Sequence, residues 1–353
     1  MKVCSSCFSD KELKGFILTS NEIGDCEVCG TASQNLLDIT ELYDFFQELI
    51  GNFKLVESGL TLSSKIQSDW SFFSSNEVAN KILNYVISQI HTEITSSDDQ
   101  VEYSDDILAN FGHWETLKDE LKWKNRFVID VHRLGKGEFN WDAFLRDINT
   151  LFNLKNTATL FRARIHNKSG MPVYPVNEMG CPPKELASGG RANPAGIPFL
   201  YLSEDENTVL YEVRASYLDE ISVGVFQLRE DNESVDIVDF TKDSPLFQPE
   251  YVKEAIQGKL LRDRISKDLS KPMRRYDSEL EYVPTQFICE YIKVFTGAKG
   301  IRFRSSLHKQ GNNIVFFEPE LMECKSVKKV KIRNIGPPPK KCRELKVAKS
   351  ISF

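Results

Sequence analysis

Four short segments decide the fold of the second half of the chain: Phe161-Arg162-Ala163-Arg164, Gly189-Gly190-Arg191-Ala192-Asn193-Pro194, Tyr201-Leu202-Ser203 and Tyr211-Glu212-Val213-Arg214. The first alternates apolar or small residues with arginines, which is typical of a β-strand. Successive side chains of a strand point to opposite faces, so Arg162 and Arg164 are expected on the same face.

The next three segments predict a loop, a strand and a helix. Two consecutive glycines would let the backbone around Arg191 approach a ligand closely. Tyr201 belongs to the strand that follows. Ser203 and Glu206 form a capping box, which places Glu212 about three turns into the next helix.

The rest of the second half predicts an α+β domain. Short apolar segments alternate there with Gly, Pro and Asn. A helix is expected over residues 285–296, directly after Pro284, and Ser305 should follow a strand that begins near Gly300. The expected strands are residues 159–165, 199–202, 223–228, 236–240, 301–304, 313–317 and 327–332.

The first half is predicted to be mainly helical. Apolar residues repeat at helical spacing over residues 39–53, and Asp38 with Glu41 forms a capping box there. A second helix over residues 78–90 has Asn76 as its expected cap. The acidic stretch 95–106 is expected to be a loop, and a helix over residues 141–154 should connect the two halves.

Paired cysteines at the N-terminus predict a zinc site. Cys4-x-x-Cys7 and Cys26-x-x-Cys29 are two knuckles whose four thiolates could surround one tetrahedral zinc ion. Four protein ligands leave no position for a water molecule, so this zinc is expected to be structural. The remaining cysteines lack such spacing.

Composition favours an ordinary globular protein. The chain has 353 residues, 41% of them hydrophobic, and a formal net charge of −6. This charge provides no whole-chain argument for binding nucleic acid or a membrane. No apolar run is long enough for a transmembrane helix, and the first residues lack a signal-peptide core, so we expect a cytoplasmic protein. Its cysteines should then be reduced thiols or metal ligands, not disulfides.

Together with Pro284-Thr285-Gln286 and Ser305, the four quoted segments resemble the RES family, which is named after its Arg, Glu and Ser residues. The resemblance covers residues 161–317. It implies a mixed α/β fold similar to ADP-ribosyltransferases and an activity that consumes NAD, in a bacterial toxin or defence effector.

The resemblance also implies a role for each matching residue. Arg162 and Arg191 would hold the dinucleotide, Tyr201 would line the pocket, Glu212 would act on the ribose, and Ser305 would complete the site. Arg164 could serve in place of Arg162, and Ser306 in place of Ser305. The family usually has proline where this chain has Arg304.

These residue types suit cleavage of NAD between nicotinamide and ribose. Nicotinamide leaves as a neutral molecule, so no strong general acid is needed. A carboxylate stabilises an oxocarbenium-like transition state, and arginine binds pyrophosphate through paired hydrogen bonds. The acceptor stays open: water in a glycohydrolase, phosphate in a phosphorylase, or a protein side chain in an ADP-ribosyltransferase.

The first half resembles the helical, HEPN-like domain of some longer RES proteins. Arg126 and His132 have the spacing of a HEPN ribonuclease pair, which makes RNA cleavage an alternative function. A third reading is an inactive interaction module held together by zinc. An antitoxin or other regulatory protein is an expected partner, and a homo-oligomer stays open.

The expected division of the chain is a zinc knuckle at 1–35, a helical domain at 36–155, a RES domain at 156–335 and a basic tail at 336–353. The composition of the tail favours a solvated end over a contact with an acidic partner or nucleic acid.

Overall fold

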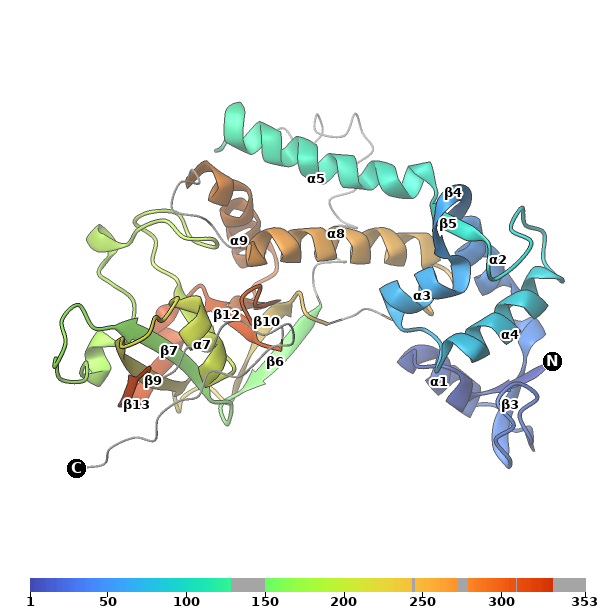
Figure 1. The fold of residues 1–353 in the computed structure, drawn as a ribbon, viewed down its shortest axis with the longest axis horizontal. Coiled ribbons are helices and arrows are strands. Elements are labelled where there is room, and N and C mark those ends of the chain that lie inside the picture. The colour runs from blue at the N-terminus through green and yellow to red at the C-terminus, as the bar shows by residue number, and fades with distance from the viewer. Residues whose placement is uncertain (128–149, 243–244, 272–278, 309, 333–353) are drawn as a thin grey trace. The chain divides into compact units, whose positions relative to one another are not determined.

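A computed structural model describes residues 1–127, 150–242, 245–271, 279–308 and 310–332 (Figure 1). The chain divides into two compact units, each considered by itself. Most of the first unit is Met1–Thr116, together with Asp243–Leu261, and most of the second is Ile148–Lys242 with Arg262–Phe353. The chain therefore leaves the first unit, builds part of the second, and returns.

The first unit combines helices with two small antiparallel sheets. Strands β1, β3 and β2 form one sheet, and β4 pairs with β5 in the other. Its elements are β1 (Lys2–Cys4), α1 (Lys11–Leu18), β2 (Ile23–Gly24), β3 (Gln34–Asp38), α2 (Tyr43–Gly51), β4 (Phe53–Thr61), α3 (Leu62–Trp70), α4 (Asn76–Ile87), β5 (Gln100–Tyr103) and α5 (Asp105–Trp123), the last of which continues into residues of the second unit.

The two helices expected from periodicity are present, with different starts. Asp38 caps a 3-10 turn, Ile39–Leu42, which leads into α2. Helix α4 is capped by Ser75, whose hydroxyl accepts from the amide of Val78, so the assignment of Asn76 as the cap was wrong. The stretch expected to be a loop contains β5, because its residues pair with β4.

One hydrophobic core runs through the first unit. It includes three of the N-terminal cysteines together with the apolar faces of α2, α3 and α4. Residues from the knuckle and from the helices thus share a core.

A segment from the second half of the chain completes this core. Leu246, Phe247, Val252 and Ile256 are buried in it. The carboxylate of Asp10 caps α1 through one oxygen and accepts the amides of Leu246 and Phe247 with the other, at 2.7 and 3.2 Å.

An eight-stranded mixed sheet forms the centre of the second unit, with the order β13-β9-β7-β8-β12-β11-β10-β6. Strands β10 and β11 are parallel, and the other neighbours are antiparallel. The elements are β6 (Leu151–Lys155), β7 (Leu160–Ile165), β8 (Leu200–Ser203), α7 (Glu206–Glu212), β9 (Glu220–Leu228), β10 (Ser234–Asp239), α8 (Val252–Ser270, which begins in the first unit), α9 (Val283–Phe295), β11 (Gly300–Arg304), β12 (Asn312–Phe316) and β13 (Met322–Lys331).

The predicted α+β class and the predicted strands agree with this sheet, whereas two other expectations do not. Residues 151–154 form strand β6 rather than the end of a helix, because they pair with β10. The remainder of that expected helix, up to residue 149, lies outside the described residues. Helix α8 had not been expected.

The sheet has two distinct faces at β7. Ala163 belongs to a cluster with Val209 and Leu210 of α7, which lies against β7 (Figure 1). Leu160 belongs to a different cluster, with Leu200 and Phe226. Side-chain alternation therefore puts Arg162 and Arg164 on the side opposite Ala163.

Strands β7 and β8 pair at a single position. Phe161 lies opposite Ser203, whereas β7 makes six such pairs with β9. The two strands part after that pair, and the long connection between them contains the Gly-Gly-Arg segment.

Candidate functional site

Glu212 is the last residue of α7, a helix of seven residues. It therefore lies about two turns from the start, not three. Asp205 caps the helix by accepting from the amides of Asn207 and Thr208, so the capping box assigned to Ser203 and Glu206 was wrong. The hydroxyl of Ser203 instead donates to Asn313 Oδ1 at 2.6 Å.

Two side chains hold the Glu212 carboxylate. Ser305 Oγ and Asn313 Nδ2 each donate to Glu212 Oε1 at 2.7 Å. Ser305 Oγ accepts in turn from the amides of Leu307 and His308, so its own proton is free to reach the carboxylate. Ser305 is 6% exposed. It is Ser305 that contacts Glu212, and the exposed Ser306 makes no such bond in the structure as described.

Arg191 comes close to the same carboxylate. Its Nη1 lies 3.9 Å from Glu212 Oε2, and both side chains remain partly exposed. This is an ion pair at the outer limit of contact, so the guanidinium keeps donors available for another anion.

The loop that carries Arg191 is held from several directions. Gln286 Nε2 donates to the carbonyls of Gly190 and Asn193, and Thr285 Oγ1 donates to the carbonyl of Arg191 at 2.6 Å. Both residues lie in the first turn of α9. A Cβ atom on Gly190 would lie 2.7 Å from both Asn193 Oδ1 and Tyr201 Oη, so only glycine fits there.

Tyr201 supports this loop directly. Its hydroxyl accepts from the amide of Ala192 at 2.9 Å and donates to Asn193 Oδ1 at 2.8 Å. Burial raises the pKa of Tyr201, so the phenol stays neutral. The contacts of Tyr201 are those of a residue that shapes the loop.

Arg162 has a different environment. Its Nη1 is buried and has no hydrogen-bond partner among the described residues. Burial lowers the pKa of Arg162, while the nearby Cys181 and Tyr201 act in the opposite direction. A buried guanidinium nitrogen without a partner is costly, and a bound anion would satisfy it.

Arg164 has different neighbours. Its Nη2 donates to the carbonyl of Gly180 at 2.9 Å, and its guanidinium lies 5.8 Å from the ring centre of Tyr174. Within the described residues, no hydrogen bond or ion pair joins Arg162 or Arg164 to Arg191, Glu212 or Ser305. Of the two arginines, only Arg162 has a buried nitrogen without a hydrogen-bond partner among the described residues.

A cavity of about 290 Å³ lies beside the Gly180–Cys181 segment. Its lining combines apolar side chains with the charged Arg229 and Glu323. It does not include Glu212, Arg191 or Ser305. The Glu212 carboxylate and the two side chains near it are therefore not part of this cavity.

Three side chains at the site were not expected from the sequence: Asn313, Ser203 and His308. His308 Nδ1 is 2.7 Å from Thr208 Oγ1, and its ring stacks on Tyr211 at 5.2 Å. Their positions depend on contacts between segments far apart in the chain. Thr285 and Gln286 had been noted as part of a motif without a role.

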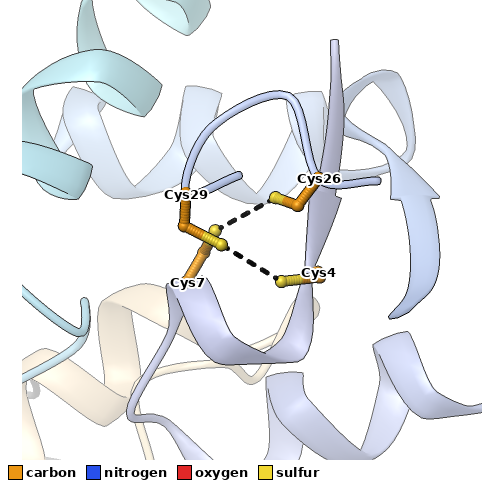
Figure 2. A group of neighbouring side chains, drawn as sticks. All are labelled: Cys4, Cys7, Cys26 and Cys29. Atoms are coloured by element: carbon orange, nitrogen blue, oxygen red, sulfur yellow. Dashed lines mark hydrogen bonds between the residues drawn. The ribbon is translucent and has the colours of Figure 1, made fainter. Parts of the chain in front are cut away.

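The four N-terminal cysteines converge as their spacing predicts. Their sulfur atoms all lie within 4.8 Å of one another (Figure 2). Cys4 Sγ is 3.5 Å from Cys29 Sγ, and Cys7 Sγ is 3.5 Å from Cys26 Sγ. Gly30 has a φ of 71°, and its amide donates to the carbonyl of Cys26, which closes the second knuckle.

The environment of these thiols opposes ionisation at two positions and favours it at a third. Burial raises the pKa of Cys4 to about 11 and also raises that of Cys7. At Cys29 burial acts in the same direction, but hydrogen bonds from Thr31 outweigh it and lower the pKa to about 6. A divalent cation would supply the positive charge that the buried sulfurs lack.

The ribonuclease alternative is not tested by the structure. Arg126 is exposed, and its Nη2 lies 3.4 Å from the carbonyl of Lys122. His132 falls outside the described residues. In the part of the chain that is described, no helix is long and apolar enough to cross a membrane.

A family model identifies much of the second half of the chain. The sequence model of the RES domain matches residues 159–334. One similar solved structure is that of the MbcT–MbcA toxin–antitoxin complex of M. tuberculosis; the match has 13% identity and a TM-score of 0.31, and covers 54% of this chain and 93% of that chain. No curated protein matches the chain. Residues 159–334 are thus a RES domain, and through this domain the chain belongs to the RES family.

Proposed function

We propose that this protein cleaves NAD between nicotinamide and ribose and acts as a toxin or defence effector. The observation that carries the proposal is the Glu212 carboxylate, held through one oxygen by Ser305 and Asn313 and faced by Arg191 through the other, inside a RES domain.

The chemistry requires little from the protein beyond charge and position. The bond between ribose C1′ and the nicotinamide nitrogen breaks, and its electron pair leaves with nicotinamide. Positive charge develops on the ribose, and the Glu212 carboxylate would stabilise it. In the hydrolytic reaction a water oxygen bonds to C1′ and its proton passes to solvent.

Arginines would hold the negatively charged part of the substrate. Arg191 is partly exposed and only loosely paired, so it could turn from Glu212 to a pyrophosphate. The unpartnered Nη1 of Arg162 supports an anion at a second point. Tyr201 would act by shaping the Arg191 loop.

Nicotinamide release is the direct test. Purified protein is mixed with NAD and nicotinamide is measured by chromatography. Glu212→Gln keeps the shape but removes the charge, so turnover should fall about 10²–10³-fold while NAD binding stays close to that of the parent.

A matched control is Glu206→Gln at the other end of the same helix, because Glu206 pairs with Lys328. This variant should turn over NAD at the parental rate. Near-parental turnover in Glu212→Gln would mean that this carboxylate is not the catalytic group. Labelled NAD with phosphate or candidate proteins identifies the acceptor.

We propose in addition that a zinc ion is held by Cys4, Cys7, Cys26 and Cys29. The donor set supports it: four sulfurs within 4.8 Å suit a tetrahedral ion with bonds of about 2.3 Å. All four positions come from the protein, so the metal would stabilise the fold and take no part in the reaction. Metal analysis should find one zinc per chain.

We also propose an antitoxin or other regulatory partner, because an enzyme that consumes NAD would harm its own cell unless it were restrained. Expression of the parent alone should arrest growth and deplete cellular NAD, and Glu212→Gln should do neither.

A further inference from the structure

Asn313 occupies a buried position between two polar side chains. It lies in β12 directly opposite Ser203 of β8 and is 6% exposed. Its Nδ2 donates to Glu212 Oε1 at 2.7 Å, and its Oδ1 accepts from Ser203 Oγ at 2.6 Å. Each end of the amide therefore has one defined partner.

The direction of these bonds determines how the amide is turned. An asparagine side chain has a donor end and an acceptor end. The Glu212 carboxylate can only accept, so the NH2 group faces it, and Oδ1 is left to accept the hydroxyl proton of Ser203, which is 2% exposed. The reverse orientation would set an oxygen against the carboxylate oxygen.

The two oxygens of Glu212 are consequently unlike each other. Oε1 receives donors from both Ser305 and Asn313. Oε2 makes no hydrogen bond among the described residues and lies 3.9 Å from Arg191 Nη1. One oxygen is anchored, and the other is left to face a substrate.

We propose that Asn313, held at its amide oxygen by Ser203, is a positioning residue that anchors Glu212 through Oε1 and keeps Oε2 directed away from Ser305. This inference rests on the proposed function of Glu212 as the group that stabilises the ribosyl cation. Asn313 acts on the reaction only through Glu212.

Two substitutions distinguish the loss of the hydrogen-bond donor at position 313 from the loss of side-chain volume. Asn313→Ala removes the donor and should lower kcat about tenfold, with KM within about twofold of the parent. Asn313→Asp keeps the volume but sets a second carboxylate against Glu212, so its kcat should be lower still. A residue that only filled space would give the opposite order, with Asp close to the parent and Ala worse.

Ser203 tests the orientation step. Ser203→Ala leaves the amide without its hydroxyl partner and should lower kcat by roughly threefold. The double variant Ser203→Ala/Asn313→Ala should be no slower than Asn313→Ala, because Ser203 acts through Asn313 alone. Additive losses of kcat in the double variant would show that Ser203 does not act through Asn313.

The same sheet offers a matched control. Asn153 in β6 donates to Ser234 Oγ at 3.1 Å and to Asp236 Oδ1 at 2.8 Å, so it also connects a serine and a carboxylate, but on an exposed edge strand. Asn153→Ala should leave kcat and KM at parental values.

Crystal structures of the parent and of Asn313→Ala give a readout that does not depend on turnover. In the variant, the Glu212 carboxylate should turn and close the 3.9 Å gap to Arg191. An unmoved carboxylate overturns the inference even if the protein proves inactive on NAD. An inactive parent with a displaced carboxylate in the variant contradicts the proposed function and leaves the positioning role supported. If the parent is active and the kcat of Asn313→Asp is higher than that of Asn313→Ala, the positioning role is wrong and the proposed function stands.

Discussion

The four-cysteine cluster and the Glu212 site achieve order in opposite ways. In the cluster, the buried sulfurs have mainly one another as neighbours, and burial holds two of them in the protonated form. At the Glu212 site, the carboxylate, serine, asparagine and loop carbonyls all find hydrogen-bond partners within the protein. The cluster needs the positive charge of a metal ion, which the protein does not supply. The carboxylate site, by contrast, is already formed without a ligand.

The difference predicts where each unit depends on a ligand. The first unit should need a metal ion to fold, because the cysteines belong to its core. The second unit should fold without NAD and bind it with little rearrangement. The following changes test this contrast, ordered by their expected effect on stability.

Metal removal should have the largest effect. Chelation, or Cys26→Ser, should unfold the first unit, because a structural zinc contributes on the order of 10 kcal/mol, as much as a typical domain's whole stability. Limited proteolysis with mass spectrometry should show cleavage within residues 1–107 and around residues 246–256, which share their core, while the eight-stranded sheet persists. Cys324→Ser, outside the cluster, is the control. An unchanged cleavage pattern after chelation would show that the first unit does not need a metal ion to stay folded.

Arg302→Leu should come next, and its effect should be confined to the second unit. Arg302 binds Glu204 through two nitrogens, at 2.6 and 2.9 Å, and Asp239 through the third at 3.0 Å. Asp239 is 2% exposed, so removing its partner leaves a buried charge and should cost about 3–5 kcal/mol. Denaturant unfolding measures this loss, and chelation should not enlarge it. Arg229→Leu, at an exposed site, should change stability little.

Tyr201→Phe should have an intermediate effect. The change leaves the amide of Ala192 and Asn193 Oδ1 without their shared partner, which should cost about 1–3 kcal/mol. NAD affinity should fall several-fold because the Arg191 loop loses support, as calorimetry can measure. Tyr217→Phe, at an exposed position, provides the comparison. Full affinity in Tyr201→Phe would show that the loop does not need this hydroxyl.

Arg191→Ala should barely alter stability. Its 3.9 Å pair with Glu212 is partly exposed, and such pairs contribute about 1 kcal/mol or less. Binding of NAD should nevertheless weaken about tenfold or more, because a charge-assisted contact to the pyrophosphate is lost. Lys328→Ala serves as a surface control. A large loss of stability with unchanged binding would reverse the roles assigned to this arginine.

Local pattern was sufficient for much of the second unit. Alternation and Gly/Pro punctuation located β7, β8, β9, β11 and β12 to within a few residues. The failures involve partners far away in the sequence. Ser203 looked like a helix cap, but its hydroxyl is used by Asn313. Residues 151–154 looked helical, but pairing with β10 makes them a strand.

The same limit applies to the site. Glu212 and Ser305 were selected by their resemblance to a family motif, and the fold brings them to 2.7 Å. Asn313 offered no signal, because an asparagine in a strand has no visible partner until the sheet is assembled. The cysteine cluster was predictable because each knuckle is formed by residues close in sequence, and two such cysteine pairs indicate a shared metal ligand.

The return of Leu246 and Phe247 to the first unit has a consequence for how the protein is made. The ring of Phe247 packs against Phe16 and Phe45. The Asp10 carboxylate accepts hydrogen bonds from the amides of Leu246 and Phe247. A ribosome must synthesise most of the RES domain before these residues emerge. Until then the nascent N-terminal unit exposes aromatic surface that chaperones or proteases could recognise. The residues that complete its core are therefore made after strands β6 to β10 but before β11, β12 and β13, and gene fragments that end before residue 245 should yield aggregation-prone protein.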